Sequence, residues 1–296
     1  MIIKQLKLEN FRNYCEEDIS FTKGINVFYG DNAQGKTNLI EALYVLSVGK
    51  SFRTIYDKEL ITFHENFLNI SCTFDAFGRQ QEHCIFIEKP HNKRITINGL
   101  LLKNRSEFIG KLQVVLFTPQ DLTLIKDGPH QRRKFIDLCI SQLSPRYLYT
   151  LSQYHKVLAQ KARLLKDLKF KPSLVDTLDI WNEKLSELAA IMISFRRDFL
   201  EKLQNYAAKI HKEISNESLS MKYESSVEIN KNDKIEILKE RFLKRLNAGK
   251  EKEIGTTSCL YGPHREDISL FINGKNLKIY GSQGQQRTGV LSLKMA

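Results

Sequence analysis

The sequence predicts an α/β fold in which a helical lobe is inserted into a strand-rich one. Short β-type runs dominate residues 1–128, helical periodicity takes over in residues 129–258, and strand-like runs return in residues 259–296. A glycine-containing loop also stands between a short apolar run and a helical pattern, as it does where a strand leads into a helix. We therefore expect residues 1–128 and 259–296 to build one lobe around the helical insertion.

The first part predicts sheet strands around a single helix. Residues 2–8 alternate polar and apolar side chains, and residues 25–29 form a β-type run directly before the glycine-containing loop. Residues 36–48 place apolar side chains at helical spacing. Asn98-Gly99 predicts a hairpin turn. Further β-type or apolar runs cover residues 19–21, 67–77, 82–88, 94–102 and 112–117.

The middle of the chain predicts long helices. Residues 132–142 have a helical pattern, and Ser144-Pro145 supplies an N-cap and a proline at the first position of the next helix. After Pro172, apolar residues recur in steps of three and four over about forty residues, which predicts one long helix or a helix broken once. Another helix is expected over residues 234–246.

The last part returns to strand patterns. Residues 258–260 and 268–280 are strand-like, and Asn273-Gly274 predicts a second hairpin turn. The final residues, after 287, again have an amphipathic helical pattern.

Composition excludes several classes of protein. The chain has 296 residues, of which 42% are hydrophobic and 27% charged, as in globular proteins with a buried core. No apolar run approaches the roughly 20 residues needed to cross a bilayer, and the start does not resemble a signal peptide. The five cysteines are scattered without metal or redox spacing. We therefore expect a reduced cytoplasmic protein without a membrane partner.

The positive charge is concentrated in the helical segment. The formal net charge is +12; residues 129–258 carry 25 basic and 17 acidic side chains, while residues 1–128 carry 16 and 15. A basic excess in one segment suits a polyanion such as nucleic acid. A solvated basic face that keeps the protein soluble explains the charge equally well.

The glycine-containing loop fits the P-loop pattern G-x-x-x-x-G-K-[ST]; it consists of Gly30, Asp31, Asn32, Ala33, Gln34, Gly35, Lys36 and Thr37. Its backbone N–H groups and the following helix N-terminus suit phosphates. Lys36 is expected to reach the β- and γ-phosphates of ATP, and the Thr37 hydroxyl to bind Mg²⁺. A chance match is the alternative, and the flanking strand and helix patterns argue against it. Kinases, GTPases and ABC-type ATPases all carry such a loop.

A second nucleotide-related pattern lies near the end of the chain. Residues 282–287, S-Q-G-Q-Q-R, resemble the ABC-type signature S-x-G-[EQ]-[RKQ], which in ABC-type ATPases opens a helix and completes the nucleotide site of a second subunit. The Ser282 hydroxyl, the Gly284 N–H and the helix N-terminus suit a γ-phosphate, with Gln285 beside them. An ordinary polar loop before a helix is the alternative. With the P-loop, this pattern predicts an ABC-type P-loop ATPase lobe with an inserted helical lobe.

The chain as a whole resembles the bacterial RecF recombination-repair family, relatives of SMC-type ATPase heads. The matches run in the family's order along essentially the whole chain. They are residues 8–14, 30–42, 49–53 and 117–122, Gly128-Pro129 with Arg132-Arg133, and residues 262–267 and 282–287.

The resemblance implies a function and partners. It implies an ATP-dependent homodimer that binds single-stranded or gapped DNA, with the P-loop of one copy facing Ser282 and Gly284 of the other. It further implies work with the mediators RecO and RecR, which load RecA, in DNA repair, replication restart and the SOS response. A weak DNA-stimulated ATPase activity is also implied.

Four residues outside the two motifs gain roles by the same resemblance. Arg12 and Asn13 would approach the nucleotide phosphates, and Arg53 would be a further phosphate-facing arginine. Gln120 would be the Q-loop residue, which links Mg²⁺ and the attacking water to the helical lobe. The alternative for the arginines is a surface or ion-paired side chain. For Gln120 it is a one-residue slip onto Asp121.

One expected element is missing from the sequence. An ABC-type site needs a Walker B strand, an apolar run that ends in Asp and is followed by a carboxylate that orients water. We find none, and the family would place it after Ala296. We expect either a piece of a longer protein, which we favour, or a short form that binds ATP without hydrolysing it.

Two other classes of function stay open at this point. An SMC-like structural ATPase head would need long heptads running out and back, for which a helix of about forty residues is too short. A P-loop enzyme acting on small molecules would show neither nucleotide-dependent dimerisation nor affinity for DNA.

Overall fold

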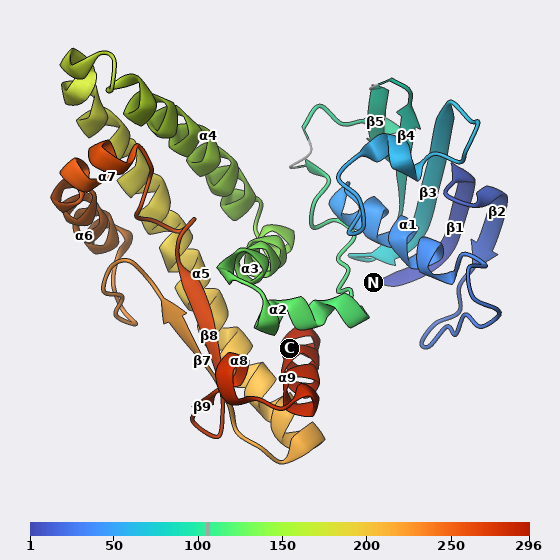
Figure 1. Ribbon diagram of the computed structural model, residues 1–296. Helices are drawn as coiled ribbons and strands as arrows, with labels where there is room; N and C mark the ends of the chain where they lie inside the picture. Colours follow the sequence, from blue (N-terminus) through green and yellow to red (C-terminus); the bar gives the residue numbers. More distant parts are fainter. Residues whose placement is uncertain (91, 105–106) are drawn as a thin grey trace. The chain divides into compact units, whose positions relative to one another are not determined.

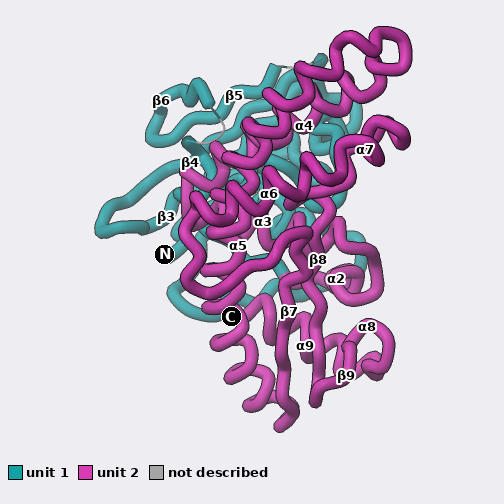
Figure 2. The backbone as a smooth tube through the Cα atoms, turned by 90° about the vertical axis from the view of Figure 1, so that its left-hand side faces the viewer, with its two compact units in different colours: residues 1–116 teal, residues 117–296 magenta. Residues whose placement is uncertain are grey.

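The computed structural model describes residues 1–90, 92–104 and 107–296, which form two compact units (Figures 1 and 2). Met1–Leu116 make up the first unit and Phe117–Ala296 the second. The boundary therefore falls before residue 128, and residues 259–296 join the helical segment in one unit.

A six-stranded antiparallel sheet with the order β2-β1-β3-β4-β5-β6 forms the framework of the first unit (Figure 1). Side chains alternate along β3, so that Leu68, Ile70, Cys72, Phe74 and Ala76 are buried. This period of two is expected for a strand with one face on a core. The strands are β1 Ile2–Phe11, β2 Tyr14–Ser20, β3 Phe67–Ala76, β4 Arg79–Glu88, β5 Asn92–Ile97 and β6 Leu100–Leu101.

Helix α1, Lys36–Val48, supplies the other half of this core. It begins after Gly35 and ends at Gly49, both of which have a positive φ angle that a glycine adopts without strain. Its apolar residues join Leu6, Leu8 and the inward side chains of β3 in one cluster. A short 3₁₀ turn, η1 Asp57–Leu60, follows α1. The predicted helix and most predicted strands are confirmed, as is the turn at Asn98-Gly99.

The strand expected at residues 25–29 is wrong. No described strand pairs with this segment, and Ile25, Val27 and Tyr29 are exposed, while Phe28 packs on Phe21. A β-type composition shows only that the side chains would fit a sheet. A strand also needs a neighbouring strand whose backbone groups pair with its own N–H and C=O groups.

Three other segments also differ from expectation. No described strand covers residues 112–117, where Leu112 forms an isolated bridge with Ile109, and residues 258–260 lie outside every described strand. Residues 277–280 form a short helix, because the Asn276 side chain accepts hydrogen bonds from the N–H groups of Lys278 and Ile279 and so caps it.

The second unit is built around α5, an unbroken helix over Thr177–Ser215 (Figure 1). Helices α4, α6 and α9 and strand β7 pack against it and enclose the largest apolar cluster. A small antiparallel sheet has the order β7-β8-β9. The unit contains η3 Pro119–Leu122, α2 Thr123–Lys126, α3 Pro129–Leu143, α4 Pro145–Asp167, η4 Pro172–Asp176, β7 Leu219–Glu224, α6 Ile235–Ala248, α7 Lys250–Thr256, β8 Asp267–Ile272, β9 Lys275–Asn276, α8 Leu277–Tyr280 and α9 Gln283–Met295.

Local sequence signals explain where these helices begin. The Ser144 side chain accepts a hydrogen bond from the N–H of Tyr147, and Pro145 occupies the first turn of α4, as predicted. None of the helices in the described part of the chain is both long and apolar enough to cross a membrane.

Candidate nucleotide-binding site

The predicted P-loop lies in the first unit and leads directly into α1. Gly30 and Gly35 have φ angles of 143° and 102°, and Ala33 has 68°, so the loop bends repeatedly in the left-handed region. The Lys36 ammonium donates hydrogen bonds to the carbonyl oxygens of Gly30 and Asp31, at 2.7 and 2.6 Å. The ammonium group is thus already held inside the bend of the loop, where a phosphate would need it.

The first turn of α1 offers the remaining groups for an anion. Thr37 is exposed there, and Asn32 and Gln34 are exposed in the loop. The first N–H groups of this 13-residue helix carry partial positive charge. In the described ranges no group of three or more acidic, His or Cys side chains could hold a metal. The exposed Thr37 hydroxyl is a group that could join nucleotide oxygens and water around Mg²⁺.

The turn between β1 and β2 packs against the P-loop. A Cβ atom built on Gly35 would lie 2.6 Å from Tyr14 Oη and 2.9 Å from Asn13 Nδ2, so only glycine fits here. Asn38, next to Thr37, donates from Nδ2 to Asn13 Oδ1 at 2.7 Å. Burial, with a smaller contribution from the charge of Glu17, raises the pKa of Tyr14. Asn13 and Tyr14 thus both lie beside the loop; the contact of Asn13 with nucleotide phosphates stays a prediction.

Arg12 is held by a buried carboxylate. Its Nε and Nη2 donate to the two oxygens of Glu41 at 3.0 and 2.6 Å, and its Nη1 donates to the Glu59 carbonyl at 2.7 Å. Glu41 lies on α1 and is completely buried. All three donor groups of the Arg12 side chain therefore have protein partners.

Arg53 shares the same carboxylate but is more open. Its Nη1 donates to Asn38 Oδ1 at 2.7 Å and to Glu41 Oε2 at 3.1 Å. The Arg53 side chain is 42% exposed, against 18% for Arg12. Ser51 also donates its hydroxyl to Glu41. One carboxylate thus organises two arginines beside the first turn of α1.

The sequence alone predicts no role for Glu41. The available signal was an acidic residue inside the otherwise apolar stretch of residues 39–43. A charge at such a position in a core helix needs a buried partner of opposite charge.

The predicted Q-loop position lies in the second unit. Gln120 is exposed in η3, and the described structure shows no side-chain contact that would define its role. Its neighbour Asp121 caps this turn together with Thr118 and forms an ion pair with Lys294 at 2.7 Å.

The signature-like segment opens α9, as expected from the family resemblance. The Ser282 hydroxyl accepts a hydrogen bond from the Gln285 N–H at 3.2 Å, and the Gln285 side chain accepts one from the Ser282 N–H at 3.0 Å. This reciprocal capping box fixes the start of the helix. Gln285 also donates to Glu217 at 2.7 Å, and Gly284 is exposed.

Residues 262–267 form the polar core of the second unit. Asp267 receives two hydrogen bonds from Arg132, at 2.7 and 2.9 Å, and the Pro263 carbonyl accepts one from buried Arg196 at 2.8 Å. His264 Nδ1 lies 2.7 Å from the Tyr154 hydroxyl. The family match over this segment therefore corresponds to a structural network.

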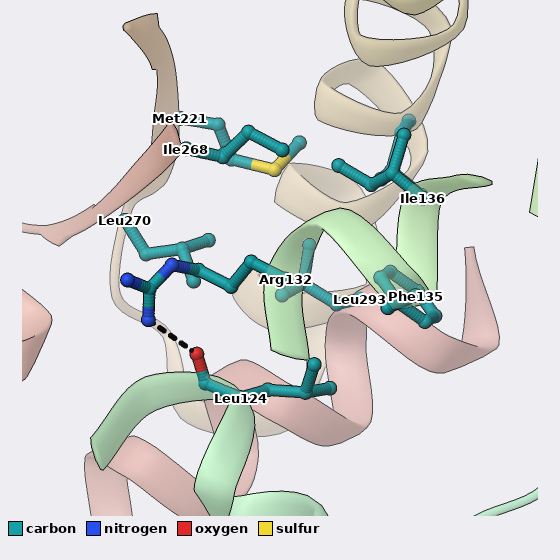
Figure 3. Close-up of a pocket in the computed structure, with 9 residues that line it drawn as sticks. Leu124, Arg132, Phe135, Ile136, Met221, Ile268, Leu270 and Leu293 are labelled. Atoms are coloured by element: carbon teal, nitrogen blue, oxygen red, sulfur yellow. Dashed lines mark hydrogen bonds between the residues drawn. The ribbon is translucent and has the colours of Figure 1, made fainter. Parts of the chain in front are cut away.

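An apolar hollow in the second unit does not suit a nucleotide. Figure 3 shows Arg132 at its side, donating to the Leu124 carbonyl at 2.8 Å. The other lining residues are Leu124, Phe135, Ile136, Leu203, Met221, Ile268, Leu270 and Leu293. The guanidinium is engaged by Leu124, Asp127 and Asp267, so the hollow offers no free charge for phosphates.

Comparisons of sequence agree with these features. A family model described as an AAA ATPase domain matches residues 1–259. The DNA replication and repair protein RecF of Alkaliphilus oremlandii is 43% identical over 300 residues, which cover 100% of this chain and 81% of that protein. RecF of Acetivibrio thermocellus is 40% identical over 298 residues, with the same shares covered.

Comparisons of structure point the same way. A solved structure of the recombination mediator protein RecF with ATP, in the RecFOR pathway, superposes with a TM-score of 0.94 at 38% identity and covers 99% of this chain and 79% of that one. An Smc head bound to the C-winged helix domain of ScpA has a TM-score of 0.53 at 15% identity, covers 99% and 75%, and shows the shared fold alone. This chain has the ABC/SMC-like ATPase head fold and belongs to the RecF family of DNA replication and repair proteins.

Proposed function

We propose that this chain binds ATP and, in response, dimerises and binds DNA in recombinational repair and replication restart. The observation that carries the proposal is the P-loop, in which the Lys36 ammonium lies within the bend at the N-terminus of α1. The 38% identity to RecF solved with ATP supports the choice of nucleotide.

At the P-loop, each group has a task in binding ATP. Lys36 exchanges the carbonyls of Gly30 and Asp31 for the β- and γ-phosphates, and the loop N–H groups surround the same phosphates. Bound Mg²⁺ would neutralise phosphate charge, with the Thr37 hydroxyl among its ligands. Arg53 is better placed than Arg12 to contact a phosphate, because its guanidinium is more exposed and only its Nη1 is engaged by described residues.

The second copy would supply the signature-like segment. Ser282 and Gly284 lie at the N-terminus of α9, where a hydroxyl and backbone N–H groups suit the γ-phosphate of the facing subunit. The partners that fit this role are single-stranded or gapped DNA and the RecO and RecR mediators. We propose that the chain works in the cytoplasm together with these partners.

Replacement of Ser282 tests the dimer. Ser282→Arg should leave ATP affinity unchanged and abolish the ATP-dependent increase in mass measured by light scattering. Since Ser282 also caps α9, the matched control is Ser144→Arg, which removes the N-cap hydroxyl of α4 and adds the same charge. An ATP-dependent dimer that persists in Ser282→Arg would sink the signature role.

DNA binding has its own test. Contacts to phosphates release counterions, so the logarithm of the association constant should fall linearly and steeply with the logarithm of salt concentration. An association constant that does not change with salt concentration would show that the basic side chains of the second unit do not bind DNA phosphates.

A structural SMC-type role is less well supported. Helix α5 packs against α4, α6, α9 and β7 of its own unit and does not extend as a free arm. A small-molecule enzyme remains distinguishable, since it would bind ATP without an ATP-dependent dimer.

A further inference from the structure

An aromatic side chain projects from the turn that joins α4 to η4 and α5. Phe170 is 85% exposed, although the adjoining ends of α4 and α5 both contribute side chains to a buried apolar cluster. Its backbone is fixed, because the N–H groups of Phe170 and Lys171 both donate to the Asp167 carbonyl, at 3.0 and 2.9 Å. Figure 1 shows α4 and α5 side by side, with this turn at one end of the pair.

The exposure of Phe170 is not explained by a lack of apolar neighbours. Leu165 at the end of α4 and Leu168 directly after it are buried in a cluster with Leu178 and Cys259. A single exposed apolar side chain is common on protein surfaces and does not by itself indicate a binding site. The basic side chains around the Phe170 ring, by contrast, point to a ligand.

Four basic side chains lie within eight residues of Phe170 on the same segment. Lys169 and Lys171 flank it directly, and Arg163 and Lys166 precede it on the last turns of α4. The acidic residue among them, Asp167, lies 3.9 Å from Arg163. Across the described ranges, no ion pair involves Lys166, Lys169 or Lys171, and all three are exposed.

A rigid aromatic ring between unpaired ammonium groups suits single-stranded nucleic acid. An unstacked base offers a flat face to the ring, while the ammonium groups reach the phosphates on either side. A duplex presents its phosphates to the same lysines but keeps its base faces inside the stack. The ring should therefore distinguish a single strand from a duplex.

We propose that Phe170, with Lys166, Lys169 and Lys171, forms a base-stacking contact for single-stranded DNA on the second unit. The contact rests on the proposed DNA-binding function and goes beyond it, because it assigns a preference for unpaired bases to one turn. It uses no residue of the nucleotide site.

Equilibrium binding to labelled oligothymidine and to a duplex of equal length tests the contact. Phe170→Ala should weaken binding to the single strand about tenfold and leave binding to the duplex unchanged. Phe170→Trp should restore the affinity, and its emission, in a Trp181→Phe background, should be quenched by the single strand. The matched control is Phe77→Ala, because Phe77 is 75% exposed at the β3–β4 turn of the first unit.

Alanine at Lys166, Lys169 and Lys171 together should reduce the salt slope for the single strand by about two, since each contact to single-stranded phosphate contributes about 0.7. An unchanged slope would overturn the assignment of the lysines.

The outcomes separate this contact from the wider function. Unchanged single-strand affinity in Phe170→Ala, or an equal loss for the duplex, overturns the stacking contact while DNA binding stands. A wild-type protein that binds neither DNA overturns both. If Phe170→Ala instead weakens binding to phosphatidylserine vesicles and spares the single strand, the turn is a membrane contact.

Discussion

Glu41 binds Arg12 through both carboxylate oxygens, with Arg12 Nη2 at 2.6 Å and Nε at 3.0 Å, and it does so completely out of contact with solvent. The same carboxylate accepts a hydrogen bond from Arg53, so one negative charge faces two guanidinium groups. The excess positive charge is left beside the first turn of α1, where the phosphates of ATP are expected. Glu41 therefore connects the stability of the first unit to the charge of its nucleotide site.

We expect Glu41→Ala to destabilise the first unit by about 3 kcal/mol. Removal of Glu41 leaves the largely buried Arg12 guanidinium without its charged partner, and breaking a buried ion pair in this way costs more than the pair contributes. Hydrogen exchange of the α1 amides measures this loss, because opening of the unit exposes them.

Glu41→Asp should recover part of that stability, since it keeps the charge on a shorter side chain. The control is Glu16→Ala on β2, where the side chain is exposed and the change should stay within about 0.5 kcal/mol. Equal protection of α1 in Glu41→Ala and Glu16→Ala would show that the buried pair has no such role.

Lys36→Ala should lower the affinity for ATP by about a hundredfold, because hydrogen bonds to charged groups contribute up to about 3 kcal/mol. The fold should persist, since the hydrogen bonds of the Lys36 ammonium within the described ranges go to the loop carbonyls of Gly30 and Asp31. Isothermal titration calorimetry measures the change. Lys23→Ala, an exposed lysine in the same unit, is the control, and retained affinity in Lys36→Ala would refute the P-loop assignment.

The elements that could be predicted from sequence are those specified by local signals. The glycines that bound α1, the cap at Ser144, the hairpin turns and the apolar stripe of α5 each act over a few residues. The strand expected at residues 25–29 failed because pairing depends on a partner far away in sequence, which composition does not reveal.

In the candidate site too, some residues could be predicted from local motifs and others could not. The P-loop and the helix start at Ser282 follow from short motifs. Glu41 and Tyr14 could not be assigned, because their roles arise only when α1 and the β1–β2 turn meet in the folded unit.

Stability of the second unit should rise with pH between about 4 and 6.5. Burial lowers the pKa of His264 to about 4, with the charges of Arg265 and Arg133 acting in the same direction and the hydrogen bond to the Cys259 carbonyl opposing it. The unfolded chain, in which histidine titrates near 6.5, therefore binds a proton in this window that the folded unit does not. This contribution to the free energy of unfolding is at most about 3 kcal/mol. It is complete above about pH 6.5 and is lost as the pH falls towards about 4.

Urea unfolding followed by the fluorescence of Trp181, on α5 of the second unit, measures this dependence. His264→Asn should flatten the pH curve, whereas His130→Asn, at an exposed position on α3, should leave it unchanged. A curve that is already flat for the wild type would contradict the assignment to His264.

Replacing Lys161 alone should destabilise the second unit strongly, whereas replacing Lys161 and Glu253 together should destabilise it much less. Their charged atoms lie 2.6 Å apart with both side chains fully buried, and the second Glu253 oxygen accepts from the Leu260 N–H at 2.8 Å. Lys161→Met should cost about 3–5 kcal/mol, because the carboxylate stays buried without its partner.

Adding Glu253→Gln to that variant should restore most of the loss, since no charge then remains and the amide oxygen still accepts from Leu260. Trp181 fluorescence in urea compares the three proteins. Lys239→Met, which removes a pairing to Glu187 at the surface, should not shift the unfolding midpoint measurably. If the double variant is as unstable as Lys161→Met alone, shape and packing at α4 and α7, rather than the uncompensated charge, determine the loss.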